Sequence, residues 1–303
     1  MGISAPRKKL HSAKSWLRSK KTNQNSEKIE TLGRLGNLEV RLARNASEIR
    51  KAQTLRYKVF YKEMDAKASV GTKLLRRDSD RLDPFCDHVL VIDHKPEKTS
   101  RLKPRRAKVV GTYRLLRQDV AEKTSGFYSQ DEFDIAPLLR RHASLRFLEL
   151  GRSCVLKPYR TKKTVELLWH GVWSYILAHK MDVLIGCASF EGTDVKKHAL
   201  ALSYLHHFHT KDDEWQASAI PEICVDMNIL EKDTIDVKKA LLCMPPLMKG
   251  YLRIGAMIGK GAVIDKQFNT IDVLMILPVS KISEKYIGYF GADATRYAEK
   301  EMP

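Results

Sequence analysis

A strand, a helix and a second strand follow one another within residues 145–190, and this unit constrains the fold more than any other feature. Residues 145–156 alternate as a strand does, and residues 161–180 carry an apolar stripe at helical spacing. Residues 183–190 are apolar almost throughout, which indicates a strand buried on both faces. A strand, a crossover helix and a neighbouring strand form a right-handed parallel unit. We therefore predict two parallel strands side by side.

The segments before this unit predict antiparallel pairing instead. A strand at residues 38–42 is followed by a helix that begins near Asn45, and further strands are expected at 88–93 and 109–116. The connections between these strands suit antiparallel neighbours better than crossovers. The chain is therefore expected to form a mixed α/β sheet and not a doubly wound one.

The part of the chain after residue 194 predicts elements that complete the same sheet and close the site. We expect a helix to about residue 207, a strand at 222–227, a helix from Pro245 and a last strand at 272–277. The chain then divides into a basic arm (1–37), a core (38–193) and a C-terminal extension (194–303).

The net charge of +18 predicts an anionic partner. Much of the excess lies in the arm, which is either a disordered tail or a short basic amphipathic helix through Leu10, Ala13 and Leu17 on an anionic membrane surface. We expect no nucleic-acid binding, because the strands lack interleaved aromatic and basic residues. A non-catalytic basic module that binds nucleic acid is the alternative from a different class of protein.

The cysteines and the apolar segments indicate a cytoplasmic protein. The sequence has five cysteines and no C-x-x-C pair, so neither a disulfide framework nor a zinc finger is expected. No apolar stretch is long enough to span a bilayer, and no apolar segment follows the basic N-terminus as in a secretory signal. We expect a protein that is soluble or peripheral on the inner membrane, with no metal and no bound cofactor.

Four local patterns place polar residues in a fixed order along the chain. They are Arg56-x-x-x-Phe60 in the first helix, Asp78-x-Asp80-x-x-Asp83 in the next loop, Arg114 in the third strand and Glu149-x-x-Arg152 in the fourth. The set resembles that of the acyl-homoserine-lactone synthases, in which a glutamate stands in the place of Asp78. Each pattern alone is weak, and the specificity lies in the ordered set.

The sequence is more similar to another family of the same superfamily, the L-ornithine Nα-acyltransferases of ornithine-lipid synthesis, often labelled hemolysin-like. The resemblance covers residues 38 to about 290 and rests on five segments: Leu55-Arg-Tyr-Lys-Val-Phe-Tyr, Phe147-Leu-Glu-Leu-Gly-Arg-Ser-Cys, Gly186-Cys-Ala-Ser-Phe, Pro245-Pro-Leu-Met-Lys-Gly-Tyr-Leu-Arg and Asp265-x-x-Phe268-Asn-Thr-x-Asp272-Val. It implies a GNAT-like N-acyltransferase fold. It also implies an acyl-carrier-protein thioester as donor and L-ornithine as acceptor. A synthase of the acyl-homoserine-lactone type with another amine acceptor is the alternative enzyme.

Glu149 is the expected centre of the chemistry. A thioester is already activated, so an acyltransferase mainly aligns the amine and removes its proton. Alternation places Glu149 among apolar neighbours, where burial favours the neutral form of a carboxylic acid. Arg152 has the opposite parity, and a bulge at Gly151 would bring it to the same side. We hypothesise that Glu149 is the general base or orients the amine, while Arg152 and Arg114 hold a carboxylate. A buried structural Glu–Arg pair is the alternative.

The remaining motif residues are assigned to substrate binding. Three loop aspartates (Asp78, Asp80 and Asp83) suit an acceptor with two ammonium groups. The resemblance adds Arg56 and Phe60 to this set. A solvated loop with local arginine counter-charges is the alternative. A calcium loop is excluded, because Leu82 and Val89 occupy two of the positions that require ligands.

The turn after the fourth strand predicts how the donor is held. It contains no glycine between Tyr159 and Thr164, so close approach of the backbone to a pyrophosphate, and hence free CoA, is disfavoured. Arg160, Lys162 and Lys163 stand at a helix start and suit the single phosphate of a carrier-bound phosphopantetheine. A solvated basic helix start is the alternative.

Overall fold

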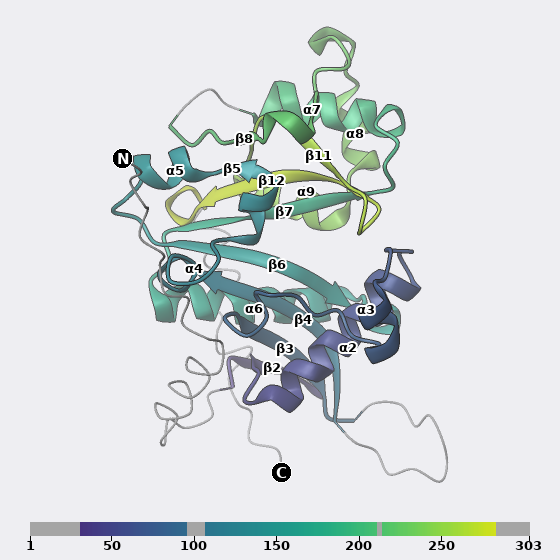
Figure 1. The fold of residues 1–303 in the computed structure, drawn as a ribbon, viewed down its shortest axis with the longest axis vertical. Coiled ribbons are helices and arrows are strands. Elements are labelled where there is room, and N and C mark those ends of the chain that lie inside the picture. Colours follow the sequence, from purple (N-terminus) through teal and green to yellow (C-terminus); the bar gives the residue numbers. More distant parts are fainter. Residues whose placement is uncertain (1–30, 96–106, 211–213, 283–303) are drawn as a thin grey trace, which may run out of the picture.

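A mixed sheet runs through the part of the chain that the computed structural model describes, residues 31–95, 107–210 and 214–282 (Figure 1). The order of the strands across the sheet is β1-β2-β3-β4-β6-β7-β12-β11-β9, and β10 also pairs with β12. Their bounds are Gly33–Leu35 (β1), Leu38–Leu42 (β2), Asp87–Asp93 (β3), Lys108–Arg117 (β4), Phe147–Val155 (β6), Val183–Glu191 (β7), Cys224–Val225 (β9), Met257–Ile258 (β10), Ala262–Asp265 (β11) and Thr270–Pro278 (β12). A small separate sheet pairs β5 (Phe133–Asp134) with β8 (Ser218–Ala219).

The helices lie on both faces of this sheet. The α-helices are α2 (Ala46–Lys62), α3 (Val70–Leu75), α4 (Gln118–Ala121), α5 (Ala136–Arg141), α6 (Lys162–His179), α7 (Ala199–His209), α8 (Val237–Cys243) and α9 (Pro246–Arg253). The short 3-10 helices are η1 (Tyr128–Asp131), η2 (Lys157–Tyr159), η3 (Lys196–His198), η4 (Pro221–Ile223), η5 (Lys232–Thr234) and η6 (Val279–Lys281). Within these residues, none of the helices is both long enough and apolar enough to cross a lipid bilayer.

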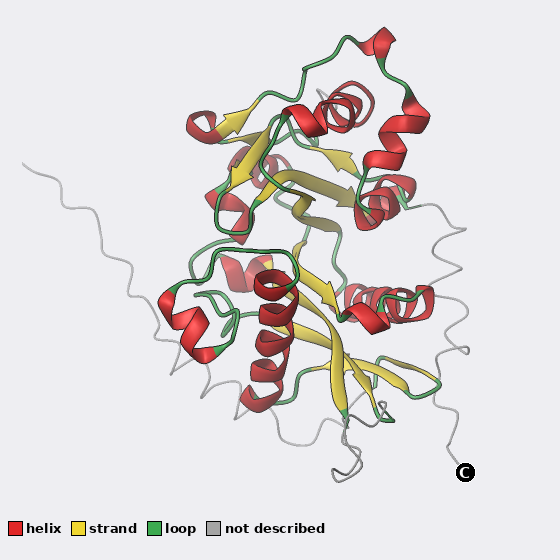
Figure 2. Cartoon of the chain, turned by 90° about the vertical axis from the view of Figure 1, so that its right-hand side faces the viewer, coloured by secondary structure: helices red, strands yellow, loops and turns green. Residues whose placement is uncertain are grey.

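The expected fold class is confirmed. Strands β6 and β7 are parallel and joined by α6, while β2, β3, β4 and β6 pair as antiparallel neighbours. Helix α2 begins at Asn45, whose side chain accepts hydrogen bonds from the backbone N–H groups of Ser47 and Glu48. Helices α2 and α6 cover opposite faces of the β2–β6 part of the sheet (Figures 1 and 2).

The structure differs from the sequence prediction at both edges of the sheet. Strand β1 lies within the segment that was expected to be an arm, and it forms a hairpin with β2 through Gly36, which has a φ of 59°. The strand expected at 222–227 is reduced to Cys224–Val225, because the chain enters it through the 3-10 turn of η4 that starts at Pro221. The proposed amphipathic helix of the arm lies outside the described residues.

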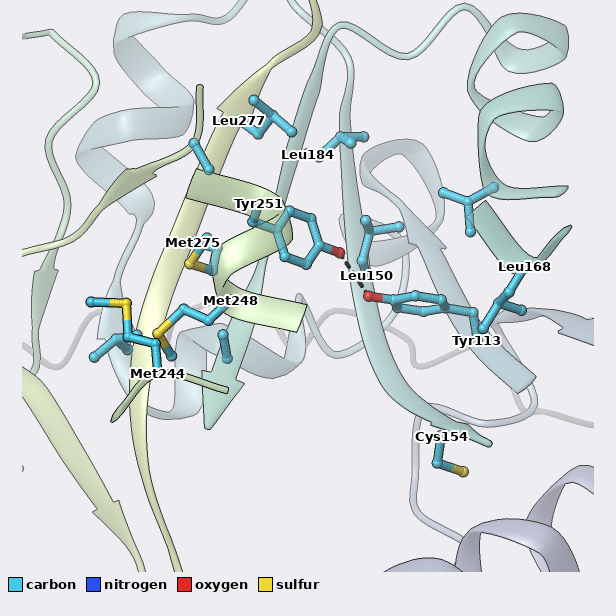
Figure 3. Close-up of a cluster of buried hydrophobic side chains, with 14 of the residues drawn as sticks. Tyr113, Leu150, Cys154, Leu168, Leu184, Met244, Met248, Tyr251, Met275 and Leu277 are labelled. Carbon is cyan, nitrogen blue, oxygen red and sulfur yellow. Dashed lines mark hydrogen bonds between the residues drawn. The ribbon is translucent and has the colours of Figure 1, made fainter. Parts of the chain in front are cut away.

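The C-terminal extension contributes to the main hydrophobic core. Strand β12 pairs with β7 along its whole length, and α9 buries Tyr251 beside the sheet. The hydroxyl groups of Tyr251 and of Tyr113 on β4 are 2.6 Å apart, and Figure 3 shows this contact among Leu150, Leu184 and a group of methionines. The buried side chains of the extension therefore pack against β4 and β6, on the face of the sheet that α6 also covers.

Gly186 permits the close approach of β7 to β6, which leads to a first prediction. A Cβ atom on Gly186 would lie 2.3 Å from the backbone oxygen of Leu150, and a backbone atom cannot turn aside as a side chain can. Gly186→Ala is expected to lower the free energy of unfolding by about 1–3 kcal/mol, as overpacking does. Chemical denaturation followed by circular dichroism measures this change. Gly250→Ala is the matched control, since nothing lies within 4 Å of its added Cβ. Equal stability of the two variants would contradict the prediction.

Candidate functional site

Strand β6 is irregular where it faces β4. Arg114 pairs with Gly151 and Thr112 pairs with Cys154, so β6 holds one residue more than β4 between these pairs. Arg152 lies in this bulge with a φ of 52°, in the left-handed region that residues other than glycine rarely adopt. The sequence located the bulge at Gly151, next to the residue that adopts the unusual conformation. The bulge directs Arg152 toward the same aspartate that Arg114 contacts.

Arg56 is the most buried member of an arginine–aspartate cluster, which consists of Arg56, Arg114, Arg152, Asp78, Asp80 and Asp83. Its exposed fraction is 0%. Both terminal nitrogens of Arg56 donate to the two oxygens of Asp83, at 2.9 and 2.7 Å, and Nε lies 2.8 Å from Asp78 Oδ2. Burial alone would raise the pKa of Asp83, but the adjacent Arg56 lowers it well below the usual range of a carboxyl group.

The other two arginines of the cluster share Asp80. Arg114 Nη1 lies 2.6 Å from Asp80 Oδ2, and Arg152 Nη2 lies 3.3 Å from the same oxygen. Burial alone would raise the pKa of Asp80, yet these two guanidinium groups lower it. The sequence assigned the aspartates to an ammonium group and the arginines to a carboxylate, whereas here the two sets neutralise each other.

Two aromatic rings enclose the guanidinium group of Arg152. Its central carbon lies 4.5 Å from the ring centre of Tyr128 and 4.5 Å from that of Phe268. Phe60 packs edge-on against Phe268, with ring centres 5.6 Å apart. The motif residue Phe60 therefore acts on Arg152 through Phe268.

Glu149 is buried and accepts three hydrogen bonds from η1. The backbone N–H groups of Tyr128 and Ser129 each donate over 2.8 Å, and the Ser129 hydroxyl donates over 2.6 Å. Among the described residues, Glu149 forms no ion pair with Arg114 or Arg152, so the alternative of a buried structural Glu–Arg pair is not formed. The link between Glu149 and Arg152 runs through Tyr128, whose backbone contacts the first and whose ring contacts the second.

The regular pairing of strands β6 and β7 ends at Glu149, although the next residues, Leu150 and Gly186, still lie close together. The two strands pair only from Phe147 to Glu149 and from Val183 to Ile185, although β6 continues to Val155 and β7 to Glu191. The outer edge of β6 is taken by β4 and that of β7 by β12. The inner edges of the two strands beyond Glu149 therefore carry backbone N–H and C=O groups without a partner strand in the described part of the chain. Such edges accept an extended, amide-bearing chain.

An acidic cluster lies close to the end of this pairing and was not recognised from the sequence. It consists of Glu132 after η1, Cys187 on β7 and Asp272 on β12, whose possible ligand atoms all lie within 4.8 Å of one another. The signal for Asp272 was present, since it is the one carboxylate in a mostly apolar strand, as Glu149 is. Glu132 carried no such signal, because it precedes a strand of only two residues.

The residues assigned to the donor lie between η2 and the first turn of α6. Arg160 forms an ion pair with Glu63, and Lys162 lies 3.7 Å from Glu166. Lys162 and Lys163 occupy the exposed first turn of this helix, where positive charge is unfavourable for the helix dipole. A bound anion at this end would offset that effect.

Known acyltransferases resemble this chain along most of its length. Residues 55–170 match the model of the acetyltransferase (GNAT) domain family. The chain is 54% identical over 269 residues to an L-ornithine N(alpha)-acyltransferase of Rhizobium meliloti (strain 1021), with 89% of each chain covered. It is 52% identical over 275 residues to the enzyme of the same name from Agrobacterium fabrum, with 91% of this chain and 92% of the relative covered. Among solved structures, an N-acyl amino acid synthase from uncultured soil microbes matches 80% of this chain and 91% of its own, with a TM-score of 0.44 and 11% identity.

Proposed function

Because this chain belongs to the L-ornithine N(alpha)-acyltransferase family, we propose that it transfers a fatty acyl group from acyl carrier protein to the α-amine of L-ornithine. The chain is an acyltransferase with a GNAT domain. The observation that supports the acceptor most directly is an identity of 39–54% to four relatives of that name. The product would be an N-acylated ornithine, the first intermediate of ornithine-lipid synthesis.

The reaction forms an amide at the expense of a thioester. The neutral α-amine attacks the thioester carbonyl carbon, a C–N bond forms, and the C–S bond breaks. The nitrogen loses a proton and the sulfur leaves as a thiol, so the proton balance is closed without a further reactant. No metal or redox group takes part in this scheme.

The hydrogen bonds of Glu149 support our proposal that it orients the amine and accepts its proton. A carboxylate offers about four lone-pair directions, and three of those on Glu149 are used by η1. One direction therefore remains for an ammonium or amine group. Glu149 lies where the pairing of β6 and β7 ends. Its carboxylate is therefore close to the place where the thioester end of a donor arm between these strands would lie.

The shared contact with Asp80 supports our proposal that Arg152 and Arg114 bind the carboxylate of the acceptor. Both contact Asp80, the most exposed aspartate of the cluster, with 25% of its side chain accessible. A ligand carboxylate that takes the place of Asp80 would meet both guanidinium groups, which are well suited to carboxylate geometry. Asp78 and Asp83 stay bonded to Arg56, so we propose that these two aspartates hold the arginines and do not contact the amines.

The donor is proposed to lie between β6 and β7. A phosphopantetheine arm carries two amide groups, which suit the free backbone edges beyond Glu149. Arg160, Lys162 and Lys163 at the start of α6 would then meet its phosphate and the acidic surface of the carrier protein. We also propose that the basic arm contacts anionic lipid, although these residues lie outside the described part of the chain.

Incubation with 3-hydroxyacyl carrier protein and a panel of amino acids tests the proposed function. Mass spectrometry should detect acylation of ornithine at its α-amine, well above that of amino acids with one amine. Acylation of another amine in place of ornithine, or no transfer at all, would overturn the proposal.

The basic start of α6 leads to a prediction about the donor. Lys162→Glu combined with Lys163→Glu is expected to raise KM for the acyl carrier protein about tenfold and to leave kcat nearly unchanged, because charge on the rim mainly affects encounter. For the unaltered protein, the same KM should rise with added salt. The charge-matched control reverses Lys238 and Lys239, which are exposed on α8. A KM that does not respond to salt, or equal turnover with acyl-CoA, would contradict the prediction.

A further inference from the structure

The acidic cluster of Glu132, Cys187 and Asp272 has no part in the scheme above. Glu132 is 9% exposed and Asp272 is 4% exposed. Buried carboxylates are normally paired with a cation or fully hydrogen-bonded. In the described residues, no arginine or lysine forms an ion pair with either group, in contrast to the three aspartates of the arginine–aspartate cluster.

The hydrogen bonding of this cluster is also incomplete. Oδ1 of Asp272 is buried without a hydrogen-bond partner, while Ser189 and Thr270 lie near enough to its carboxyl group to offset part of the rise in its pKa. The contact to Glu132 is a weak one, in which the Cys187 thiol donates over 3.3 Å. An unpartnered carboxylate oxygen in a buried site costs free energy, and a small cation would remove that cost.

The cluster lies on the same face of the sheet as Glu149, beyond the point where the pairing of β6 and β7 ends. Glu149 is opposite Ile185, and Cys187 is two residues further along the same face of β7. Cys187 is opposite Leu274 of β12, and Asp272 is again two residues away. The step from Glu149 to Cys187 is therefore about one strand spacing plus two residues, or roughly 8 Å. Asp272 lies one strand further, and its carboxylate and that of Glu132 each have an oxygen within 4.8 Å of Cys187 Sγ. The two amines of an extended five-carbon diamino acid are roughly 6 Å apart, and a hydrogen bond of about 2.9 Å at each end extends this reach to roughly 12 Å.

We propose that Glu132 and Asp272, with Cys187 beside them, bind the side-chain ammonium group of the acceptor. This inference rests on the proposed function, because it assumes an acceptor whose α-amine is held near Glu149. The pair then selects an acceptor with a second, distal amine. A structural zinc is the less suitable occupant, since such sites have four protein ligands and only three candidate ligands come together here among the described residues.

The ionisation of the pair gives the inference a pH dependence. Burial, together with the charge of Asp272, raises the pKa of Glu132 to about 8, and burial raises that of Asp272 to about 6. Below about pH 6 both groups are neutral and offer no counter-charge, so binding of the ammonium group strengthens as the pH rises through these values. The charged and titratable groups that face the pair are Asp265 on β11, Arg152 and Glu149 on β6, Cys187 on β7 and Tyr128 on η1.

Comparing ornithine with norvaline, which has the same carbon chain without the distal amine, tests the inference. Asp272→Asn and Glu132→Gln are each expected to lower kcat/KM for ornithine about 100-fold and to leave that for norvaline within about twofold, because only ornithine meets the pair. In the unaltered protein, the ratio of the two kcat/KM values should rise between pH 6 and 8. Asp134→Asn is the control, since Asp134 is exposed on β5, two residues from Glu132.

Two measurements keep the test decisive if a variant folds poorly. Calorimetry of the unaltered protein at pH 7, in buffers of different ionisation enthalpy, should show proton release when ornithine binds and none when norvaline binds. Metal analysis should find no stoichiometric metal. If the unaltered protein does not acylate ornithine, the proposed function is wrong. If the unaltered protein does acylate ornithine, two results would overturn this inference alone. One is that both variants keep the full preference for ornithine; the other is that the unaltered protein contains a metal that both variants lack.

Discussion

Replacing Arg56 by methionine is expected to lower the free energy of unfolding by about 3–5 kcal/mol, because two buried carboxylates lose their nearest cation. Each keeps only a longer contact, Asp83 with Arg114 at 3.3 Å and Asp78 with Arg152 at 3.4 Å. Arg56 is fully buried and holds Asp78 and Asp83 at 2.8 and 2.7 Å. Methionine has a similar length and packs well, so the loss measures the stranded charges and not a cavity. Urea denaturation followed by circular dichroism gives the value.

A control variant and the pH dependence of the stability loss distinguish stranded charge from a general loss of packing. Arg146→Met removes a pair with Asp182 that is largely exposed, and it should cost less than about 1 kcal/mol. The pKa of Asp83 is lowered in the folded protein, so its contribution to stability is present above its unfolded pKa and is lost as the pH falls. The deficit of Arg56→Met should therefore be largest at neutral pH and narrow below about pH 4. A deficit that does not change with pH would point to packing.

Local patterns were sufficient to predict the central part of the fold. The apolar run of β7 and the amphipathic stripe of α6 are each strong enough to be recognised alone, and their order dictates the parallel pairing of β6 with β7. Strand β1 was also predictable, since Gly36 and Asn37 form a favourable two-residue hairpin turn before β2. The shortness of β9 was not, because an edge strand depends on contacts that the sequence pattern does not contain.

The sequence singled out the residues of the arginine–aspartate cluster but not their contacts. The structure brings Arg56, Arg114, Arg152 and the loop aspartates of the ordered motifs into one region. Composition cannot say which charges neutralise each other, since that depends on distances of a few ångströms between segments far apart in the chain. The sequence analysis therefore assigned the loop aspartates to ligand ammonium groups, whereas they are paired with arginine. It did not identify Glu132 and Asp272, which form no ion pair with arginine in the described part of the chain.

The pair of Glu132 and Asp272 should reduce stability in the absence of ligand. Both pKa values are raised above those of the unfolded chain, so the folded protein holds more protons and loses stability as the pH rises from about 4 to about 8. Such a cost is common where residues are kept for binding and not for stability. The arginine–aspartate cluster has the opposite sign, since the lowered pKa of Asp83 favours the folded state above pH 4. The two clusters thus differ in their effect on stability although both contain buried carboxyl groups.

Glu149→Gln is expected to lower kcat about 1000-fold, within the range observed for loss of a positioned acid–base group. Glutamine keeps one acceptor oxygen but turns an NH2 group toward the N–H donors of Tyr128 or Ser129, so about 1–3 kcal/mol of stability should also be lost. Steady-state kinetics on protein shown to be folded by circular dichroism measures the effect.

Two comparisons distinguish catalysis by Glu149 from support of η1 alone. Ser129→Ala removes one of the three donors and leaves the carboxylate, so it should cost stability but reduce turnover less than about tenfold. The loss in Glu149→Gln should be the same for ornithine and for norvaline, because both present an α-amine, whereas loss of Asp272 affects ornithine alone. A folded Glu149→Gln variant with near-normal turnover would leave Glu149 as a structural anchor for Tyr128. In that case Arg152, which Tyr128 covers, would become the residue on which alignment of the acceptor depends.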